Sequence, residues 1–178
     1  AFNILVLGGS GFLSGTIVRE ALAMGHRVWT LTRGLRPVPA GTTNLLADRK
    51  DCAAFEQVVK GAETHWDMVI DCIGYDPSDV RVAIGVLAPL TSHMVFVSTD
   101  FVYEPIHRRF PQNEETDFYL SEDYGGLKRQ CELEFLAADT GEMKWSIVRP
   151  CHIYGPGSLL GCFPTHGRDP KLIAKLKA

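Results

Sequence analysis

Several features that would assign a protein to a broad class are missing from this 178-residue sequence. No run approaches the roughly 20 consecutive apolar residues that a membrane-spanning helix requires. Its start has no basic segment ahead of an apolar one, so it does not read as a signal peptide. Lys and Arg number 18 against 21 Asp and Glu, and this mild acidity disfavours nucleic acid, because phosphate binding draws on clustered cations. We therefore expect a folded protein with neither a membrane nor a nucleic-acid partner.

Cysteine is scarce, and its pattern is not that of a disulfide framework. The chain has five cysteines and no C-x-x-C pair, which fits a reducing compartment and predicts a cytoplasmic location. A zinc set could be drawn from Cys151, His152, Cys162 and His166. The spacing is poor for zinc, however, and a Pro/Gly loop separates the two pairs. We predict no metal site.

What the chain does contain is a regular alternation of short apolar runs and longer helical patterns. The runs predict strands at residues 3–7, 27–32, 43–47, 67–73, 94–98 and 145–148. The intervening patterns predict helices at 12–24, 51–60, 78–87 and 122–138, with Leu13, Ile17, Ala21 and Met24 along one stripe of the first. This rhythm predicts an α/β fold, a doubly wound parallel sheet of the Rossmann type, with ligand chemistry at the carboxyl ends of the strands.

A glycine-rich loop lies between the first predicted strand and the first predicted helix. Glycines there permit a tight turn and let the backbone approach a pyrophosphate, whose charge the helix N-terminus offsets. In the pattern G-x-x-G-x-x-G, Ser14 replaces the third glycine and Gly15 follows it. Because serine is small, we expect a dinucleotide site with a slightly altered shape, formed by Gly8, Ser10, Gly11, Phe12 and Leu13.

The end of the second predicted strand carries an arginine where NAD-binding proteins place a carboxylate. Arg33 could pair with a 2′-phosphate in a forked geometry, so we predict NADP as the cofactor, with NAD as the alternative. Arg33 could instead be a solvated loop residue. Asp48, at the end of the third strand, is placed near the adenine, although both it and Asp51 could cap the next helix.

Tyr124 and Lys128 lie four positions apart on one predicted helix and therefore share a face. A nearby ammonium stabilises phenolate, which lowers the phenol pKa from ~10 and suits general acid/base chemistry. The fifth strand delivers the Thr99 hydroxyl to the same sheet edge, where it could hold a substrate oxygen. An exposed helical pair is the alternative for Tyr124 and Lys128, and Asp100 could be a simple turn residue.

Four stretches of the chain, at residues 8–13, 98–103, 124–128 and 149–156, resemble the extended short-chain dehydrogenase/reductases, or NAD(P)-dependent epimerase/dehydratase family. The resemblance implies that Tyr124 is the acid/base and that Thr99 takes the Ser/Thr place. It implies that Lys128 lowers the phenol pKa and binds the nicotinamide ribose. It further implies cofactor contacts from Cys72, Ile73, Gly74, Ser98, Pro150 and Ile153.

The resemblance also implies an activity, namely NAD(P)-dependent oxidation, reduction or epimerisation of a secondary alcohol or ketone, such as that of a sugar nucleotide. Phe101 stands where the family's 4,6-dehydratases carry a glutamate, which argues against dehydration. The alternative is a non-catalytic dinucleotide-binding protein that acts as a sensor or binds RNA or protein, because residues 73–77 are similar to a chloroplast RNA-binding branch. A homodimer is one option for its assembly.

Residues 1–155 suffice for one dinucleotide-binding domain, and only about two dozen residues follow, with a short basic helix expected at 170–177. A region that closes over a substrate needs more chain than this. We therefore expect residues 156–178 to begin a C-terminal substrate-binding region that is largely missing from this sequence, which also lacks an initiator Met.

Overall fold

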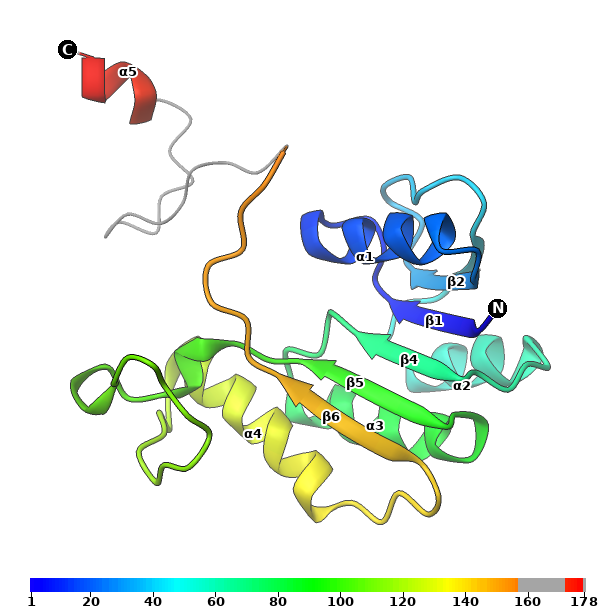
Figure 1. The fold of residues 1–178 in the computed structure, drawn as a ribbon. Helices are drawn as coiled ribbons and strands as arrows, with labels where there is room; N and C mark the ends of the chain where they lie inside the picture. Colours follow the sequence, from blue (N-terminus) through cyan, green and yellow to red (C-terminus); the bar gives the residue numbers. More distant parts are fainter. Residues whose placement is uncertain (157–171, 178) are drawn as a thin grey trace.

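The computed structural model describes residues 1–156 and 172–177. Six strands form one sheet in the order β3-β2-β1-β4-β5-β6, and every neighbouring pair is parallel (Figure 1). Between them run the helices that return the chain to the amino edge of the sheet. The elements are β1 (Asn3–Leu7), α1 (Phe12–Ala23), β2 (Arg27–Thr32), β3 (Thr43–Leu46), α2 (Cys52–Gly61), β4 (Met68–Asp71), α3 (Pro77–Leu87), η1 (Ala88–Leu90), β5 (His93–Val97), η2 (Asp100–Val102), η3 (Pro105–His107), α4 (Asp123–Ala137), β6 (Lys144–Val148) and α5 (Leu172–Lys177).

Helices cover both faces of the sheet, which explains why the central strands are apolar throughout. On one face α2, α3 and α4 pack over a large core that includes Leu5 and Leu7 (Figure 1). On the other face α1 packs Val18 and Ala21 against Ile4 and Val6. The predicted doubly wound parallel sheet is therefore confirmed.

Element boundaries agree closely with the predictions, but the buried stripe of α1 differs. The buried residues are Ser14, Gly15, Val18 and Ala21. Met24, predicted to lie in that stripe, is 73% exposed because α1 ends at Ala23 and Met24 is its C-cap. The small residues Ser14 and Gly15 let the first turn of α1 sit close to the glycine loop.

Two adjacent glycines bring the start of α4 unusually close to its neighbours. A Cβ on Gly125 would lie 2.1 Å from the Phe101 carbonyl oxygen, and one on Gly126 would lie 2.4 Å from the Ser121 carbonyl carbon. Glycine is a poor helix former, but at these two positions it allows α4 to lie close to the chain after β5.

The described part of the chain contains no helix long and apolar enough to cross a bilayer. The helix expected at 170–177 is observed as α5, and Pro170 and Lys171 fall outside the described residues.

Candidate functional site

The glycine loop between β1 and α1 has the tight form that the sequence predicted. Gly8 and Gly9 have φ angles of 109° and 119°, in a region that side chains rarely adopt. A Cβ on Gly9 would also lie 2.6 Å from the Thr30 methyl carbon. Ser14 departs from the usual third glycine, and its hydroxyl accepts the Gly11 N–H at 3.2 Å. The N-terminus of α1, with its orphan N–H groups, thus begins at the carboxyl edge of the sheet.

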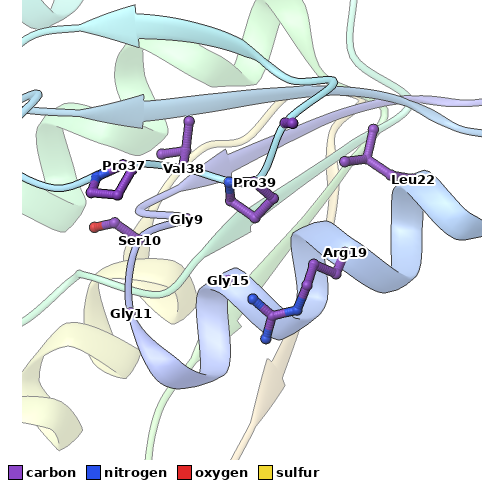
Figure 2. Close-up of a pocket in the computed structure, with 10 residues that line it drawn as sticks. Gly9, Ser10, Gly11, Gly15, Arg19, Leu22, Pro37, Val38 and Pro39 are labelled. Atoms are coloured by element: carbon purple, nitrogen blue, oxygen red, sulfur yellow. The ribbon is translucent and has the colours of Figure 1, made fainter. Parts of the chain in front are cut away.

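A pocket of about 500 Å³ opens on the α1 flank of this loop (Figure 2). The segment after β2 forms its far wall through Pro37, Val38, Pro39 and Ala40. Gly9, Ser10 and Gly11 form the near wall, and Arg19 projects from α1 at its mouth (Figure 2).

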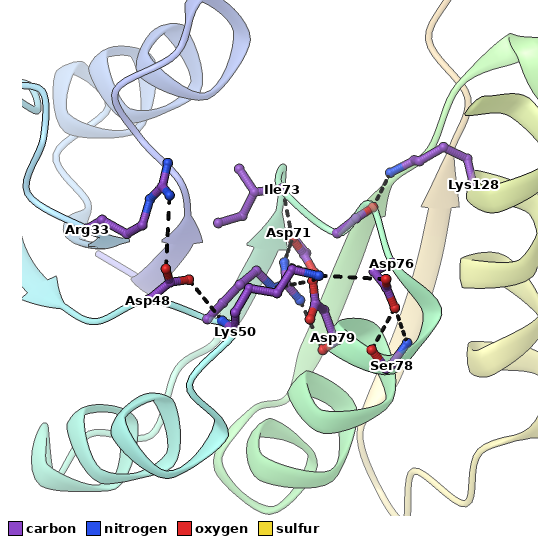
Figure 3. A network of polar contacts seen from close by, with 11 residues as sticks. Arg33, Asp48, Lys50, Asp71, Ile73, Asp76, Ser78, Asp79 and Lys128 are labelled. Carbon is purple, nitrogen blue, oxygen red and sulfur yellow. Dashed lines mark hydrogen bonds and ion pairs between the residues drawn. The ribbon is translucent and has the colours of Figure 1, made fainter. Parts of the chain in front are cut away.

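Arg33 and Asp48 meet at the carboxyl ends of β2 and β3. Their side chains are 63% and 47% exposed, and an Arg33 nitrogen lies 4.0 Å from an Asp48 oxygen (Figure 3). Sequence reasoning found no carboxylate at the end of β2, because Asp48 comes from the neighbouring strand. Asp51, and not Asp48, caps α2, since its side chain accepts the Ala54 N–H at 3.0 Å.

A buried charge cluster, absent from the sequence-based site, fixes the end of β4. The Asp71 carboxylate is fully buried and accepts two hydrogen bonds from Arg49, at 2.8 and 3.1 Å. It also accepts the Ile73 N–H at 2.9 Å, which shapes the turn at residues 72–74. Lys50 lies 2.7 Å from Asp79, so that two cations face two buried carboxylates (Figure 3). The turn predicted to face a cofactor ribose is therefore set by a desolvated ion pair.

Cys72 and Gly74 occupy this turn, and both are tightly surrounded. Burial, with the neighbouring Asp71 charge, raises the pKa of the Cys72 thiol to about 12. A Cβ on Gly74 would lie 2.7 Å from the Phe96 ring.

Lys128 is buried, with 1% of its surface exposed. Its Nζ donates to the Gly74 carbonyl at 2.6 Å and to the Val97 carbonyl at 2.7 Å (Figure 3 shows the first). Burial lowers the pKa of the ammonium, and it lies 4.1 Å from the centre of the Phe96 ring. The side chain thus joins the turn after β4 to the end of β5.

Tyr124 lies on the same helix and is 49% exposed. Its phenol lies near enough to the Thr99 side chain for that hydroxyl to lower the phenol pKa, so the predicted pair from α4 and β5 does come together. Burial raises the pKa of the phenol, and Tyr75 adds to this, whereas the Thr99 hydroxyl lowers it.

The expected effect of Lys128 on the pKa of Tyr124 stays a prediction. The two residues share a helix, but the ammonium turns inward to two backbone carbonyls while the phenol stays at the surface. In this structure the pKa of Tyr124 is raised, and burial of the phenol is the main cause.

The carboxyl ends of β5 and β6 are joined by a second buried cluster that sequence reasoning missed. Glu132 of α4 is fully buried and binds Ser98, Arg129 and Arg149. The Ser98 hydroxyl donates to Glu132 at 2.6 Å, and the cofactor contact expected from Ser98 stays a prediction. Two features of the sequence could have indicated this cluster. Glu132 lies four positions after Lys128 on the predicted helix, and Arg149 directly follows a predicted strand.

The segment after β6 runs from the sheet edge towards α1. The Asp100 N–H donates to the Pro150 carbonyl at 3.1 Å, and Gly155 lies beside the Phe12 ring. Ile153 is 43% exposed between them.

Asp100 pairs with Arg108 at 2.9 Å, so it is more than a turn residue.

Within the described residues, no group of three or more His, Cys, Asp or Glu side chains could hold a metal ion. The imagined zinc ligands Cys162 and His166 fall outside those residues.

Comparisons with known proteins match the chain to one family model and to solved structures of the same fold. The family model described as "NAD dependent epimerase/dehydratase family" matches residues 4–177. A putative NAD-dependent epimerase/dehydratase from Methylobacillus flagellatus superposes with a TM-score of 0.71 at 26% identity, over 89% of this chain and 57% of that one. UDP-glucose 4-epimerase from Thermus thermophilus, solved with NAD, has a TM-score of 0.65 at 19% identity, over 83% of this chain and 54% of that one, and supports the fold alone.

Among curated proteins, the chloroplast stem-loop binding protein of 41 kDa b of Arabidopsis thaliana is 27% identical over 169 residues. The match spans 86% of this chain and 43% of that protein. The chain therefore corresponds to about half the length of the proteins it matches.

Proposed function

The chain belongs to the NAD-dependent epimerase/dehydratase family, and from that premise we propose that it is the dinucleotide-binding part of an oxidoreductase or epimerase. Its substrate would be a secondary alcohol or ketone, with sugar nucleotides as the favoured class, as the resemblance to this family implies. Residues 1–155 would bind the dinucleotide, and residues 156–178 would begin a substrate-binding region. The observation that carries the proposal is the meeting of Tyr124 with Thr99 at the sheet edge where Lys128 is anchored.

The residues at this edge fit a nicotinamide dinucleotide. The glycine loop leaves no room for side chains, and α1 presents its N-terminus where a pyrophosphate would lie. Lys128 uses two of its three N–H donors on carbonyls, which leaves one for a ribose hydroxyl. When bound, the nicotinamide supplies hydride exchange with carbon.

The protein's own residues would handle the proton. Thr99 would orient the substrate oxygen, and the half-exposed Tyr124 would exchange a proton with it. The phenol pKa is raised in this structure, so Tyr124 is protonated at neutral pH and can donate its proton to the oxygen of a ketone that is being reduced. Lys128 lies one helical turn away, and in the oxidation direction its positive charge would favour the phenolate form of Tyr124.

Arg33 and Asp48 would distinguish the two dinucleotides. We propose a preference for NADP, with the exposed Arg33 guanidinium binding the 2′-phosphate. Asp48 opposes this preference, because its carboxylate already pairs with Arg33 and could accept the ribose hydroxyls of NAD.

Hydride transfer in the full-length protein tests the proposal. Reduction of a panel of ketones, sugar nucleotides included, is followed by NADPH and NADH absorbance for the parent and for Tyr124→Phe. We expect turnover to fall by about 10²–10⁴-fold in the variant, with the dissociation constant for the cofactor nearly unchanged. Equal turnover in the two proteins would refute the assigned role of the phenol.

The second candidate is a non-catalytic member of the family that binds RNA. It is favoured by the 27% identity to a protein named for stem-loop binding. Salt-sensitive binding of a stem-loop RNA, together with no hydride transfer to any ketone tested, would reverse the ranking.

A further inference from the structure

Glu132 is the most heavily bonded carboxylate near the proposed site. Its Oε1 accepts the Ser98 hydroxyl at 2.6 Å and the Arg149 Nε at 2.9 Å. Its Oε2 accepts Arg149 Nη2 at 2.7 Å and Arg129 Nη1 at 2.8 Å. The carboxylate is fully buried, and both oxygens are bonded twice. Burial would raise its pKa, but the hydrogen bonds from Arg149, Ser98 and Arg129 lower it, which keeps the group charged.

The partners of Glu132 are the immediate neighbours of the proposed site residues. Ser98 precedes Thr99 in the chain, and Arg149 precedes Pro150. Glu132 itself lies on α4, one turn beyond Lys128 and two turns beyond Tyr124. Its carboxylate thus joins three elements, namely the helix that carries the phenol, the strand that delivers the hydroxyl, and the segment that follows β6.

Two further bonds align the same segments. The Ser98 N–H donates to the Val148 carbonyl at 2.8 Å, which sets the register of the two strand ends. Arg149 also donates through Nη1 to the Tyr103 hydroxyl at 2.6 Å. Arg149 is therefore bonded directly to Tyr103, which follows Thr99 in the chain, and through Glu132 to Ser98, which precedes it.

From this geometry we propose that Glu132 is a positioning residue, which holds α4 against the end of β5 so that the Tyr124 phenol meets the Thr99 hydroxyl. It acts through Ser98 and Arg149 and does not itself touch a substrate. The inference deepens the proposed function, because it concerns the same pair of residues.

A gain in folding stability is a poor explanation for the buried Glu132 carboxylate and its two arginine partners. Desolvation of a buried ion pair consumes most of its coulombic gain, and buried pairs are best attested as determinants of specific geometry. The chain offers a comparison two residues away. Glu134, also on α4, forms a two-bond pair with Arg81, at 2.7 and 2.9 Å, but Arg81 is 71% exposed and neither residue adjoins the site.

The test compares Glu132→Gln with the matched control Glu134→Gln, and both are nearly isosteric changes on one helix. Ser98→Ala is the second variant, because it removes only the bond from β5 and leaves the Glu132–Arg149 pair intact. All three are prepared with 3-fluorotyrosine, whose phenol titrates at lower pH, and the ¹⁹F resonance of residue 124 is assigned with Tyr124→Phe. The measurement is the pH titration of that resonance, alongside the melting temperature.

We expect the apparent pKa of residue 124 to rise by about 0.5–1 unit in Glu132→Gln and by less in Ser98→Ala, because the phenol moves away from the Thr99 hydroxyl, whose interaction favours phenolate. Glu134→Gln should leave the titration unchanged. Equal titrations in all variants, or equal shifts in the control and Glu132→Gln, would overturn the positioning role.

Where the full-length parent turns over a ketone, Glu132→Gln should lower kcat by at least tenfold with cofactor affinity within about twofold, whereas a fall in affinity alone would contradict the inference. The fluorine titration needs no substrate. A parent without hydride transfer would therefore refute the proposed function, and the titration would still decide whether Glu132 positions Tyr124.

Discussion

The preference between NADP and NAD can be tested through the charges at the ends of β2 and β3. Arg33→Ala removes the exposed guanidinium, and Asp48→Asn removes the carboxylate that lies 4.0 Å from it. Neither residue supports the buried core, since both side chains are substantially exposed. Changes in dinucleotide affinity can therefore be attributed to charge at the 2′ position.

The size of the effect follows from the exposure of Arg33. Two unit charges about 4 Å apart interact by about 1 kcal/mol in water and about 4 kcal/mol at an effective dielectric constant of 20. The guanidinium is 63% exposed, so the lower part of this range applies, and a phosphate of charge about −1.5 to −2 gains about 1–2 kcal/mol. This corresponds to roughly a 5–30-fold change in dissociation constant.

We therefore expect Arg33→Ala to weaken NADP binding about tenfold, with NAD within about twofold. Asp48→Asn should shift affinity in the opposite direction, because it frees Arg33 and removes a repulsive charge. Titration calorimetry at low salt measures the dissociation constants of both dinucleotides for the parent and the two variants. The contrast should shrink near 1 M salt, where the Debye length is about 3 Å. Equal affinities of the parent for the two dinucleotides, or equal losses for both in Arg33→Ala, would refute the reasoning.

Three further predictions follow from packing, charge and burial. Gly125→Ala should destabilise the fold by several kcal/mol, because the added Cβ would lie 2.1 Å from a carbonyl oxygen. Gly85→Ala in α3 should stabilise the fold by up to about 1 kcal/mol, because a Cβ there would have no atom within 4 Å. Urea unfolding measures both free energies of unfolding, and equal effects would contradict the packing. The pKa of Glu132 is lower in the folded state than its usual 4.5. The charged carboxylate therefore contributes to stability above pH 4.5, and this contribution is lost as the pH falls through the pKa of the folded state. Melting temperature should consequently fall less steeply at acid pH in Glu132→Gln than in the parent. At pH 8 iodoacetamide should modify the exposed Cys52 and spare Cys72, whose pKa is about 12; mass spectrometry of native protein gives the ratio, and equal labelling would show the turn after β4 to be open.

The sequence allowed the architecture to be predicted because its signals are local. Strands buried on both faces appear in the sequence as apolar runs. The glycine loop became informative because a predicted strand precedes it and a predicted helix follows it. The resemblance to the epimerase/dehydratase family is likewise confirmed. The cytoplasmic location, the absence of a nucleic-acid partner and the homodimer stay predictions.

The electrostatics of the site were harder to foresee, because they depend on side chains that the fold brings together. Asp48 lies near Arg33 only because β3 pairs with β2. Arg49, which follows β3, contacts Asp71 at the end of β4, although 22 positions separate them in the chain. Spacing correctly placed Tyr124 and Lys128 on one helix. Spacing could not show that the Gly74 and Val97 carbonyls would draw the lysine inward.

The position of β1 at the centre of the sheet has a consequence for how the site is assembled. The strand made first pairs with β2 on one edge, but its other edge is completed only by β4, more than 60 residues later. No hairpin links any of these strands, and parallel pairs of this kind form slowly because a long stretch of chain must close first. Gly8 packs beside Ile73, which follows β4, so the loop proposed to cradle a pyrophosphate gains its complete surroundings only at that late step. A dinucleotide bound at this loop would therefore lie against a surface that is complete only when β4 has joined the sheet.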